Sequence, residues 1–355
     1  MKSIAYSRTG PASVLRLMEK EMPAPGPGEV CVRLVVSGVN PTDWKTRNGA
    51  KRASSRASVQ VPGHDGAGYV ACLGDGVEGV EIGTRVWVWE AAWQRAEGTA
   101  QEYVVLPAAN IVTLPGTASF DEGASLGIPA LTAHRALTAH ERAPASLAPG
   151  TLEGMTVLVA GGAGAVGHAA IQLASWAGAK VITTVSTERK AVMARRAGAH
   201  AVINYRSEDV VALVRQISPS GADIIVEVNA RANMDVDLAV VTGGGTIAVF
   251  TSDDIDSLIF PARECMSKNV RVQFVMTYTT TTEQKRHAVR AVQHALREGR
   301  MGVGEKHGMP LHRFRLEQAA QAHDTSEQGV MGKVLIDITE DSPNSDKEKR
   351  YQSLR

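Results

Sequence analysis

The sequence predicts an α/β fold in which a doubly wound parallel sheet is joined to a second, mostly β domain. Three observations support this prediction. Short apolar runs alternate with helical segments between residues 155 and 275, as in repeated βα units. The first third of the chain instead carries period-two strands separated by turns that contain Gly or Pro. A glycine-rich turn joins the first apolar run of the alternating region to the next helix.

The pattern of apolar residues in the first third of the sequence predicts strands that bury every second side chain. The first of these strands repeats apolar residues in this way at Val30, Val32 and Leu34. The expected strands cover residues 28–36, 68–73, 85–89 and 102–105. A helix over 131–140 and a Pro-bearing link over 143–150 then lead into the alternating region.

The alternating region predicts strands and helices that follow one another along the chain. The expected strands cover 155–160, 180–185, 201–203, 223–228, 245–250 and 270–275. The expected helices cover 165–177, 189–197, 208–217 and 233–240. Beyond this region we expect a helix over 283–298 and a strand over 332–338 that returns to the first β-rich part.

This pattern divides the 355 residues into four parts. Residues 1–129 form the mostly β domain, 130–276 form the doubly wound domain, and 277–339 return to the first domain. Residues 340–355 are polar, mixed in charge and poor in apolar side chains. We expect this last part to be a disordered tail, because it cannot bury enough apolar surface to offset the entropy of ordering.

Composition argues against several kinds of function. The 38 Lys and Arg balance 37 Asp and Glu, for a net charge of +1, so we expect neither strong nucleic-acid binding nor a membrane surface held by charge. No apolar stretch is long enough for a membrane helix. The three separated cysteines fit neither a disulfide framework nor a thiolate metal site. The three separated cysteines and the lack of an apolar signal segment together predict a cytoplasmic protein.

The glycine-rich turn is the strongest functional signal. Gly162, Gly164 and Gly167 stand at G-x-G-x-x-G spacing between a strand and a helix. The first allows a tight turn, the second lets the backbone approach a pyrophosphate, and the third lets the helix pack on the strand. The phosphates then bind at the helix N-terminus, beside the amides of Ala165 and Val166. The pattern predicts a dinucleotide-binding site.

The end of the second strand indicates which dinucleotide binds. NAD sites place an acidic residue there for the ribose 2′-hydroxyl, whereas this chain has Ser186, followed by Arg189 and Lys190. Two cations suit a 2′-phosphate, so we expect NADPH. Alternatively, Glu188 binds the ribose and the cations are solvated. Tyr205, after the third strand, either contacts the adenine or phosphate or is an ordinary surface residue.

Several further motifs resemble those of a known family. They are Gly38-Val-Asn40-Pro-x-Asp43, Pro62-Gly-x-Asp65-x-Ala-Gly68, Gly83-Thr-Arg-Val86, the stretch 127–135, Asp223-Ile-Ile-Val-Glu227 and Gly332-Lys333-Val-Leu. With them, residues 1–338 resemble the medium-chain dehydrogenase/reductase superfamily, and within it the zeta-crystallin-like NADPH:quinone oxidoreductases. The resemblance implies a GroES-like catalytic domain, a Rossmann domain, an active-site cleft between them, and a homodimer or homotetramer.

The resemblance also bears on metal binding. Alcohol dehydrogenases of the superfamily hold catalytic zinc with a Cys near the position of Asn40 and a His like His64. Asn40 replaces that Cys here, and residues 89–98 contain no Cys for the second, four-Cys zinc site. Because tetrahedral zinc needs three or four convergent ligands, we expect no metal. His64 is then a satisfied loop histidine rather than a ligand or an acid.

Without a Lewis acid, the substrate should be an acceptor that is already electron-poor, such as a quinone or an enone. The resemblance places Asn40 near the nicotinamide and the acceptor oxygen; otherwise it is a turn residue. Lys45 either stabilises an oxyanion, binds a cofactor phosphate or is a surface lysine. Further cofactor contacts implied by the resemblance, which otherwise serve packing or capping, are Thr132, Asn233, Phe250, Phe274, Met276 and Lys333.

The sequence therefore predicts a zinc-independent, NADPH-dependent quinone oxidoreductase that passes reducing equivalents to a quinone or similar activated carbonyl. The alternative is an NADPH-dependent enone or alkenal (2-alkene) double-bond reductase on the same scaffold. A third interpretation, implied by the crystallins among the relatives, is a nucleotide-binding or structural protein without catalysis.

Overall fold

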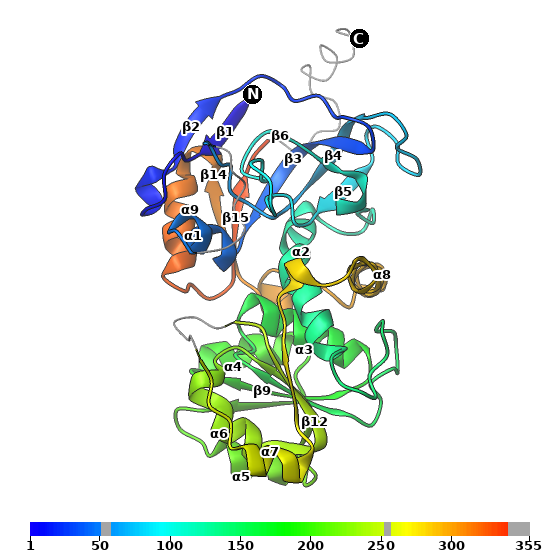
Figure 1. Ribbon diagram of the computed structural model, residues 1–355, viewed down its shortest axis with the longest axis vertical. Helices are drawn as coiled ribbons and strands as arrows, with labels where there is room; N and C mark the ends of the chain where they lie inside the picture. Colours follow the sequence, from blue (N-terminus) through cyan, green and yellow to red (C-terminus); the bar gives the residue numbers. More distant parts are fainter. Residues whose placement is uncertain (51–57, 252–256, 340–355) are drawn as a thin grey trace. The chain divides into compact units, whose positions relative to one another are not determined.

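The computed structural model describes residues 1–50, 58–251 and 257–339, which form two compact units (Figure 1). The first unit comprises Met1–Ile128 and Leu311–Arg355, and the second comprises Pro129–Pro310. The tail predicted over 340–355 lies outside the described residues. Among the described helices, none is both long and apolar enough to cross a membrane.

The first unit is built on a mostly antiparallel sheet. Its strand order is β14-β15-β3-β4-β5-β7, and β6 pairs with β3. The strands are β3 (Glu29–Val39), β4 (Asp65–Leu73), β5 (Arg85–Val88), β6 (Tyr103–Pro107), β7 (Ile111–Thr113), β14 (Leu311–Arg315) and β15 (Lys333–Asp337), beside the separate hairpin β1 (Lys2–Ala5) and β2 (Arg16–Glu19). The helices α1 (Pro41–Arg47) and α9 (Ala319–Glu327) belong to this unit, and α2 (Phe120–Leu137) begins in it. β15 pairs antiparallel with β3, so this strand returns to the first β-rich part, as expected.

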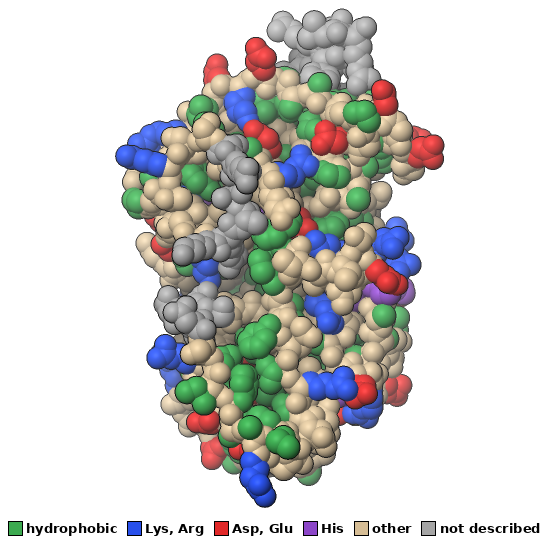
Figure 2. Space-filling model, in the orientation of Figure 1, with side chains coloured by type: hydrophobic (Ala, Val, Ile, Leu, Met, Phe, Trp, Pro, Cys, Tyr) green, Lys and Arg blue, Asp and Glu red, His purple; other side chains and the backbone are tan. Residues whose placement is uncertain are grey.

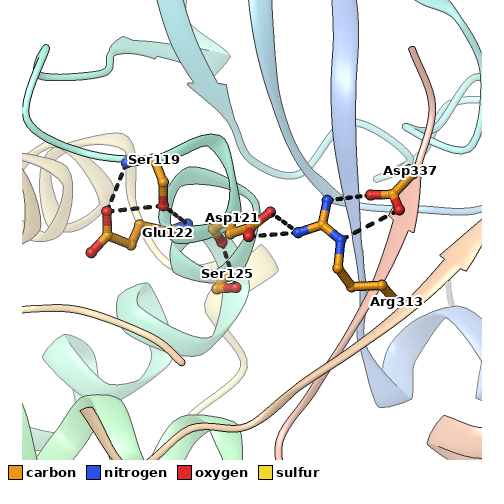
Figure 3. Close-up of polar contacts among 6 residues, drawn as sticks. All are labelled: Ser119, Asp121, Glu122, Ser125, Arg313 and Asp337. Carbon is orange, nitrogen blue, oxygen red and sulfur yellow. Dashed lines mark hydrogen bonds and ion pairs between the residues drawn. The ribbon is translucent and has the colours of Figure 1, made fainter. Parts of the chain in front are cut away.

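Helix α2 is fixed to this sheet at its N-terminal end (Figure 3). Arg313 of β14 donates hydrogen bonds to both carboxylate oxygens of Asp121 at 2.6 Å and pairs with Asp337 of β15. Ser119 and Glu122 cap the helix, because each accepts a hydrogen bond from the other's backbone amide. The start of α2 is therefore held against two neighbouring strands.

A glycine brings β3 against the backbone of α2. A Cβ atom on Gly38 would lie 2.0 Å from the carbonyl oxygen of Ala124 and 3.2 Å from Cε of Lys333. No other residue fits at that distance from a backbone oxygen. Gly38 thus sets the separation between the sheet and the helix.

The second unit contains a sheet of six parallel strands within the described residues. Its order is β10-β9-β8-β11-β12-β13. The strands are β8 (Thr156–Ala160), β9 (Lys180–Val185), β10 (Ala201–Asn204), β11 (Ala222–Glu227), β12 (Val241–Val249) and β13 (Arg271–Phe274). The helices are α3 (Ala165–Trp176), α4 (Glu188–Arg196), α5 (Val210–Ile217), α6 (Ala230–Val240), α7 (Ala262–Lys268) and α8 (Thr282–Arg297).

The strand order makes this sheet doubly wound. The chain runs outward from β8 through β9 to β10 and then returns to the other side of β8 as β11. Apolar central-strand residues such as Val157, Ile182 and Ile225 are fully buried, as in sheets covered on both faces. The predicted fold class is confirmed. Ligands of such sheets bind beyond the carboxyl ends of the strands, near the switch point.

Some elements differ from the prediction. Helix α2 begins at Phe120 instead of residue 131, and β1, β2, α1, β7, α7, β14 and α9 were not predicted. The return to the first unit begins at Leu311 rather than at residue 277, because α8 packs on α3. There, Nε1 of Trp176 donates to Glu298 at 2.7 Å, and the Trp176 ring meets the ring of His294 edge-on.

Candidate functional site

The predicted cofactor residues of the second unit follow the carboxyl ends of neighbouring strands. The glycine turn follows β8, Ser186 to Lys190 follow β9, Tyr205 follows β10, Asn233 lies in the helix after β11, Phe250 follows β12, and Phe274 and Met276 stand at the end of β13. Because parallel strands all end at the same edge of a sheet, the fold brings these residues to one edge. Thr132 reaches the same region, since its hydroxyl lies 2.5 Å from that of Thr277, next to Met276.

The glycine turn has the shape that a diphosphate requires. A Cβ atom on Gly162 would lie 2.1 Å from Oγ1 of Thr183, and one on Gly167 would lie 2.5 Å from the carbonyl oxygen of Gly161. Gly164 is exposed, and a Cβ atom there would meet nothing nearer than 3.4 Å. It caps helix α3, whose first amides, from Ala165 on, have no acceptor within the helix. These residues fit the diphosphate of a dinucleotide.

Sequence reasoning missed the role of Gly161, which precedes the fingerprint. Its φ of +69° lies in the left-handed region, so Gly161 makes the turn out of β8 possible. The signal was the doubled glycine directly after the strand.

The end of β9 presents a hydroxyl and two cations. Nζ of Lys190 donates to Oγ of the buried Ser186 at 3.1 Å, and Arg189 is exposed in the first turn of α4. Glu188, the alternative ribose ligand, instead pairs with Arg195 at 2.7 Å. Tyr205 is 52% exposed, and its backbone amide bonds the carbonyl of Val185, next to Ser186. This arrangement suits a 2′-phosphate better than a bare 2′-hydroxyl.

The other predicted contacts of the second unit vary in exposure. Phe274 and Met276 are exposed, and Phe250 is half-buried. The side-chain amide of Asn233 donates to Glu227 at 3.0 Å, so its oxygen is directed away from that carboxylate. Contact of these side chains with a cofactor stays a prediction.

Asn40 and Lys333 belong to the first unit and lie together in a buried polar cluster. Asn40 follows β3 and precedes α1, while Lys333 opens β15. Nδ2 of Asn40 donates to Asp65 at 2.6 Å, and Oδ1 of Asn40 accepts a hydrogen bond from Nζ of Lys333 at 2.7 Å. Lys333 is 3% exposed and Asn40 is 2% exposed, and contact of either side chain with a cofactor or an acceptor stays a prediction.

The kink in helix α2 holds the carboxylate of Asp65. Both of its oxygens accept from the backbone amide of Ile128 at 3.0 Å. The preceding residue, Gly127, departs from helical geometry at φ −17° and ψ −107°. A Cβ atom on Gly127 would lie 2.0 Å from Oδ1 of Asp65. The kink therefore supplies both a donor and the room that the carboxylate needs.

Asp43 and His64 complete the cluster. Asp43 accepts hydrogen bonds from the backbone amides of Asn40 at 2.7 Å and Gly63 at 3.2 Å, and Nε2 of His64 lies 3.9 Å from its Oδ1. Burial raises the pKa of Asp43 to about 7 and that of Asp65 to about 6, and it lowers the pKa of Lys333. The charges of Asp65 and Asp43 both favour the ammonium form of Lys333, whose hydrogen bond goes to Asn40.

A surface cavity of about 430 Å³, solvent included, borders this cluster. Asp43 and His64 line it, together with the aromatic residues Tyr6 and Trp93 and with Thr42 of α1. Asp43 and His64 therefore form the side of the cluster nearest this cavity, although Asp43 is only 3% exposed. Lys45, the other predicted catalytic residue, lies on α1 with its Nζ 5.3 Å from the ring centroid of Trp44.

The residues of the cluster do not fit a zinc site. In the described parts of the chain, no three His, Cys, Asp or Glu side chains converge as metal ligands. The amide of Asn40 already bonds Asp65 and Lys333. An ammonium group 2.7 Å from the Asn40 oxygen would repel a metal cation placed there.

The sequence analysis assigned no role to Asp65, although this residue belongs to one of the family motifs. A signal was present, because an acidic residue that opens an apolar strand must be paired when it is buried. The bend at Gly127 also had a signal, because Pro129 follows it closely and proline kinks helices, but the expected helix began four residues later.

Comparisons with known proteins agree with this geometry. Residues 26–116 match a family model described as the alcohol dehydrogenase GroES-like domain, and residues 165–294 match one described as zinc-binding dehydrogenase. The chain is similar to quinone oxidoreductase of Lama guanicoe, with 30% identity over 342 residues that cover 95% of this chain and 97% of the relative. It is also 31% identical over 258 residues to 2-methylene-furan-3-one reductase of Solanum lycopersicum, covering 71% of this chain and 62% of that protein.

Solved structures share the fold. A structure described as an NAD-dependent alcohol dehydrogenase aligns with a TM-score of 0.82 at 27% identity, over 96% of this chain and all of that one. Quinone oxidoreductase of Escherichia coli, complexed with NADPH, aligns with a TM-score of 0.77 at 26% identity, over 95% of this chain and 99% of that one.

The raised pKa of Asp43 predicts a pH dependence of stability. Between 3.8 in the unfolded chain and about 7 in the fold, the folded protein holds a proton that the unfolded chain has released. The free energy of unfolding therefore falls as the pH rises through this window. Asp43→Asn removes the effect. We expect the free energy of unfolding of the variant, relative to wild type, to rise by about 2 kcal/mol from about pH 5 to about pH 8 in urea denaturation.

Asp75→Asn, which changes an exposed carboxyl group, is the matched control and should follow the wild-type pH profile. Parallel profiles for Asp43→Asn and wild type would contradict the raised pKa.

Proposed function

We propose a function from the premise that this chain belongs to the quinone oxidoreductases of the medium-chain dehydrogenase/reductase superfamily. The protein is a zinc-independent oxidoreductase that passes reducing equivalents from NADPH to a quinone or a similar activated carbonyl acceptor. The observation that carries the cofactor assignment is at the end of β9. There the cations Arg189 and Lys190 stand beside Ser186, while the acidic Glu188 forms an exposed ion pair with Arg195.

The second unit binds the cofactor along one sheet edge. The amides of Ala165 to Gly167 bind the diphosphate, because the start of α3 leaves them without partners. Arg189 and Lys190 bind the 2′-phosphate, and Tyr205 covers the adenine end. Thr132, Asn233, Phe250, Phe274 and Met276 contact the remainder. When bound, NADPH supplies a hydride to the acceptor.

The first unit acts on the acceptor. Asn40 donates a hydrogen bond from Nδ2 to the acceptor oxygen, on which negative charge develops as the acceptor is reduced. One Nδ2 hydrogen bonds Asp65, which leaves the second for this purpose. Lys45 adds positive charge near the same oxygen.

A second function is supported by the similarity to the tomato 2-methylene-furan-3-one reductase. Reduction of an enone double bond needs the same cofactor and also a proton for the α-carbon. The tomato enzyme aligns with this chain over 258 residues at 31% identity, whereas the quinone oxidoreductase of Lama guanicoe aligns over 342 residues at 30% identity. We therefore place quinone reduction first.

The proposal is tested by measuring the rate at which NADPH absorbance is lost in the presence of a quinone, an enone or an aldehyde. We expect the largest kcat/KM with the quinone and no loss of rate after treatment with a chelator. A faster enone would favour the double-bond reductase. No turnover with any acceptor, or a rate that disappears with chelator and returns with zinc, would contradict the proposal.

The cofactor assignment predicts the effect of Lys190→Met. Loss of this cation should raise KM for NADPH about tenfold and leave KM for NADH nearly unchanged, because only NADPH carries the 2′-phosphate. Steady-state kinetics with both cofactors provides the measurement. Arg196→Met, on the same helix but bonded to Glu305, is the matched control and should change neither value. Equal effects of Lys190→Met on the two cofactors would contradict the assignment.

We also propose a cytoplasmic homodimer or homotetramer. Cys31, Cys72 and Cys265 are free thiols, as a reducing compartment allows. Among the described strands β13 pairs on one side only, with β12. Figure 2 shows hydrophobic side chains gathered over this part of the second unit, where Ile259, Met266 and Phe274 are exposed. An apolar edge of this kind is suited to pairing with a second chain.

Light scattering should accordingly give at least twice the mass of one chain. Met266→Glu combined with Ile259→Lys should reduce this mass, because both charges disfavour burial of the edge. A wild-type protein with the mass of one chain would contradict the proposal.

A further inference from the structure

The buried partners of Asn40 determine which way its amide points. Lys333 has only hydrogen-bond donors, and an ionised Asp65 has only acceptors. The observed orientation gives Lys333 the oxygen at 2.7 Å and Asp65 the nitrogen at 2.6 Å. A flipped amide would face an ammonium with its NH2 group and a carboxylate with its oxygen. It would lose two charge-assisted hydrogen bonds, so one orientation is selected.

The same contacts place a positive charge behind the reactive end of the amide. Nζ of Lys333 sits on the carbonyl oxygen and draws electron density from the amide nitrogen. The free Nδ2 hydrogen becomes a stronger donor, as expected for linked hydrogen bonds in a site of low dielectric constant. Lys333 acts through Asn40, because its ammonium donates a hydrogen bond directly to the oxygen of that amide.

The fold makes room for this lysine in particular. Gly38 on β3 has no side chain where Cε of Lys333 passes, since a Cβ atom would lie 3.2 Å away. Asp43 and Asp65 are the charged groups that act on Lys333 most strongly, and both favour its ammonium form. A neutral residue of the same length would fill the space but would place no positive charge beside the Asn40 oxygen.

From this geometry we propose that Lys333 is a positioning residue, which orients the side-chain amide of Asn40 and strengthens its hydrogen bond to the acceptor oxygen. The inference rests on the proposed quinone reduction and assigns Lys333 to the acceptor, in place of the cofactor contact implied by family resemblance.

The test is a double-mutant cycle between Lys333→Met and Asn40→Ala. If Lys333 acts through Asn40, Lys333→Met should lower kcat with a quinone by about tenfold or more and leave the Kd of NADPH within about twofold of wild type. In the Asn40→Ala background the same change should have no further effect on kcat. Lys2→Met, which removes an exposed lysine of the same unit, should leave kcat unchanged.

A second readout needs neither cofactor nor turnover. In protein labelled with ¹⁵N at asparagine, the side-chain amide signal of Asn40 is identified by its loss in Asn40→Ala. This signal should move upfield in Lys333→Met, because the amide is no longer polarised, and it should stay in place in Lys2→Met.

Removal of Lys333 alone strands a buried carboxylate, so Lys333→Met can fail to fold. The variant Lys333→Met/Asp65→Asn replaces it in that case and is compared with Asp65→Asn. The oxygen of the new amide can still accept from Nδ2 of Asn40. The tenfold loss of kcat should persist between these two proteins.

Three outcomes overturn the inference. A raised Kd for NADPH, with an additive loss in the Asn40→Ala background, would make Lys333 a cofactor contact. An unchanged kcat and an unmoved amide signal would leave Lys333 with a purely structural role. A wild-type protein that turns over no quinone would overturn the proposed function and this inference with it, whereas the first two outcomes leave the function intact.

Discussion

The buried carboxylate of Asp65 is the contact on which the candidate acceptor site depends. It joins three segments that lie far apart in the chain: the bend in α2 through Ile128, the end of β3 through Asn40, and the start of β15 through the charge of Lys333. An uncompensated carboxylate in this position would destabilise the fold strongly. The cost of burying Asp65 therefore forces the amide of Ile128, Asn40 and Lys333 to converge.

The two units differ in where they hold their charged groups. At one edge of its sheet, the second unit presents unpaired backbone amides and side-chain cations to an anionic ligand. Solvent at this edge lowers the free-energy cost of holding these charges. The first unit buries its charged groups, and the side-chain amide of Asn40 lies between one cation and one anion. In the proposed function, binding of the charged carrier and stabilisation of the developing charge therefore belong to separate parts of the chain.

The sequence predicted the second unit more fully than the first. Gly162, Gly164 and Gly167 define the turn through local spacing alone, and the βα alternation determines where the strands end. The Asn40 cluster depends on partners 25 and 293 residues away. No local pattern indicates that Lys333 meets Asn40, so family resemblance placed it at the cofactor. Helix α8 was misassigned for the same reason, since its packing on α3 is a long-range contact.

Gly38 couples the packing of helix α2 to the position of Lys333. Its missing side chain accommodates both a helix carbonyl and the methylene groups of a buried lysine. Any larger residue there would push the helix away or displace the lysine, and either movement would separate the charged pair around the amide. This strand position, which lies outside the glycine fingerprint, therefore controls the geometry of the Asn40 cluster.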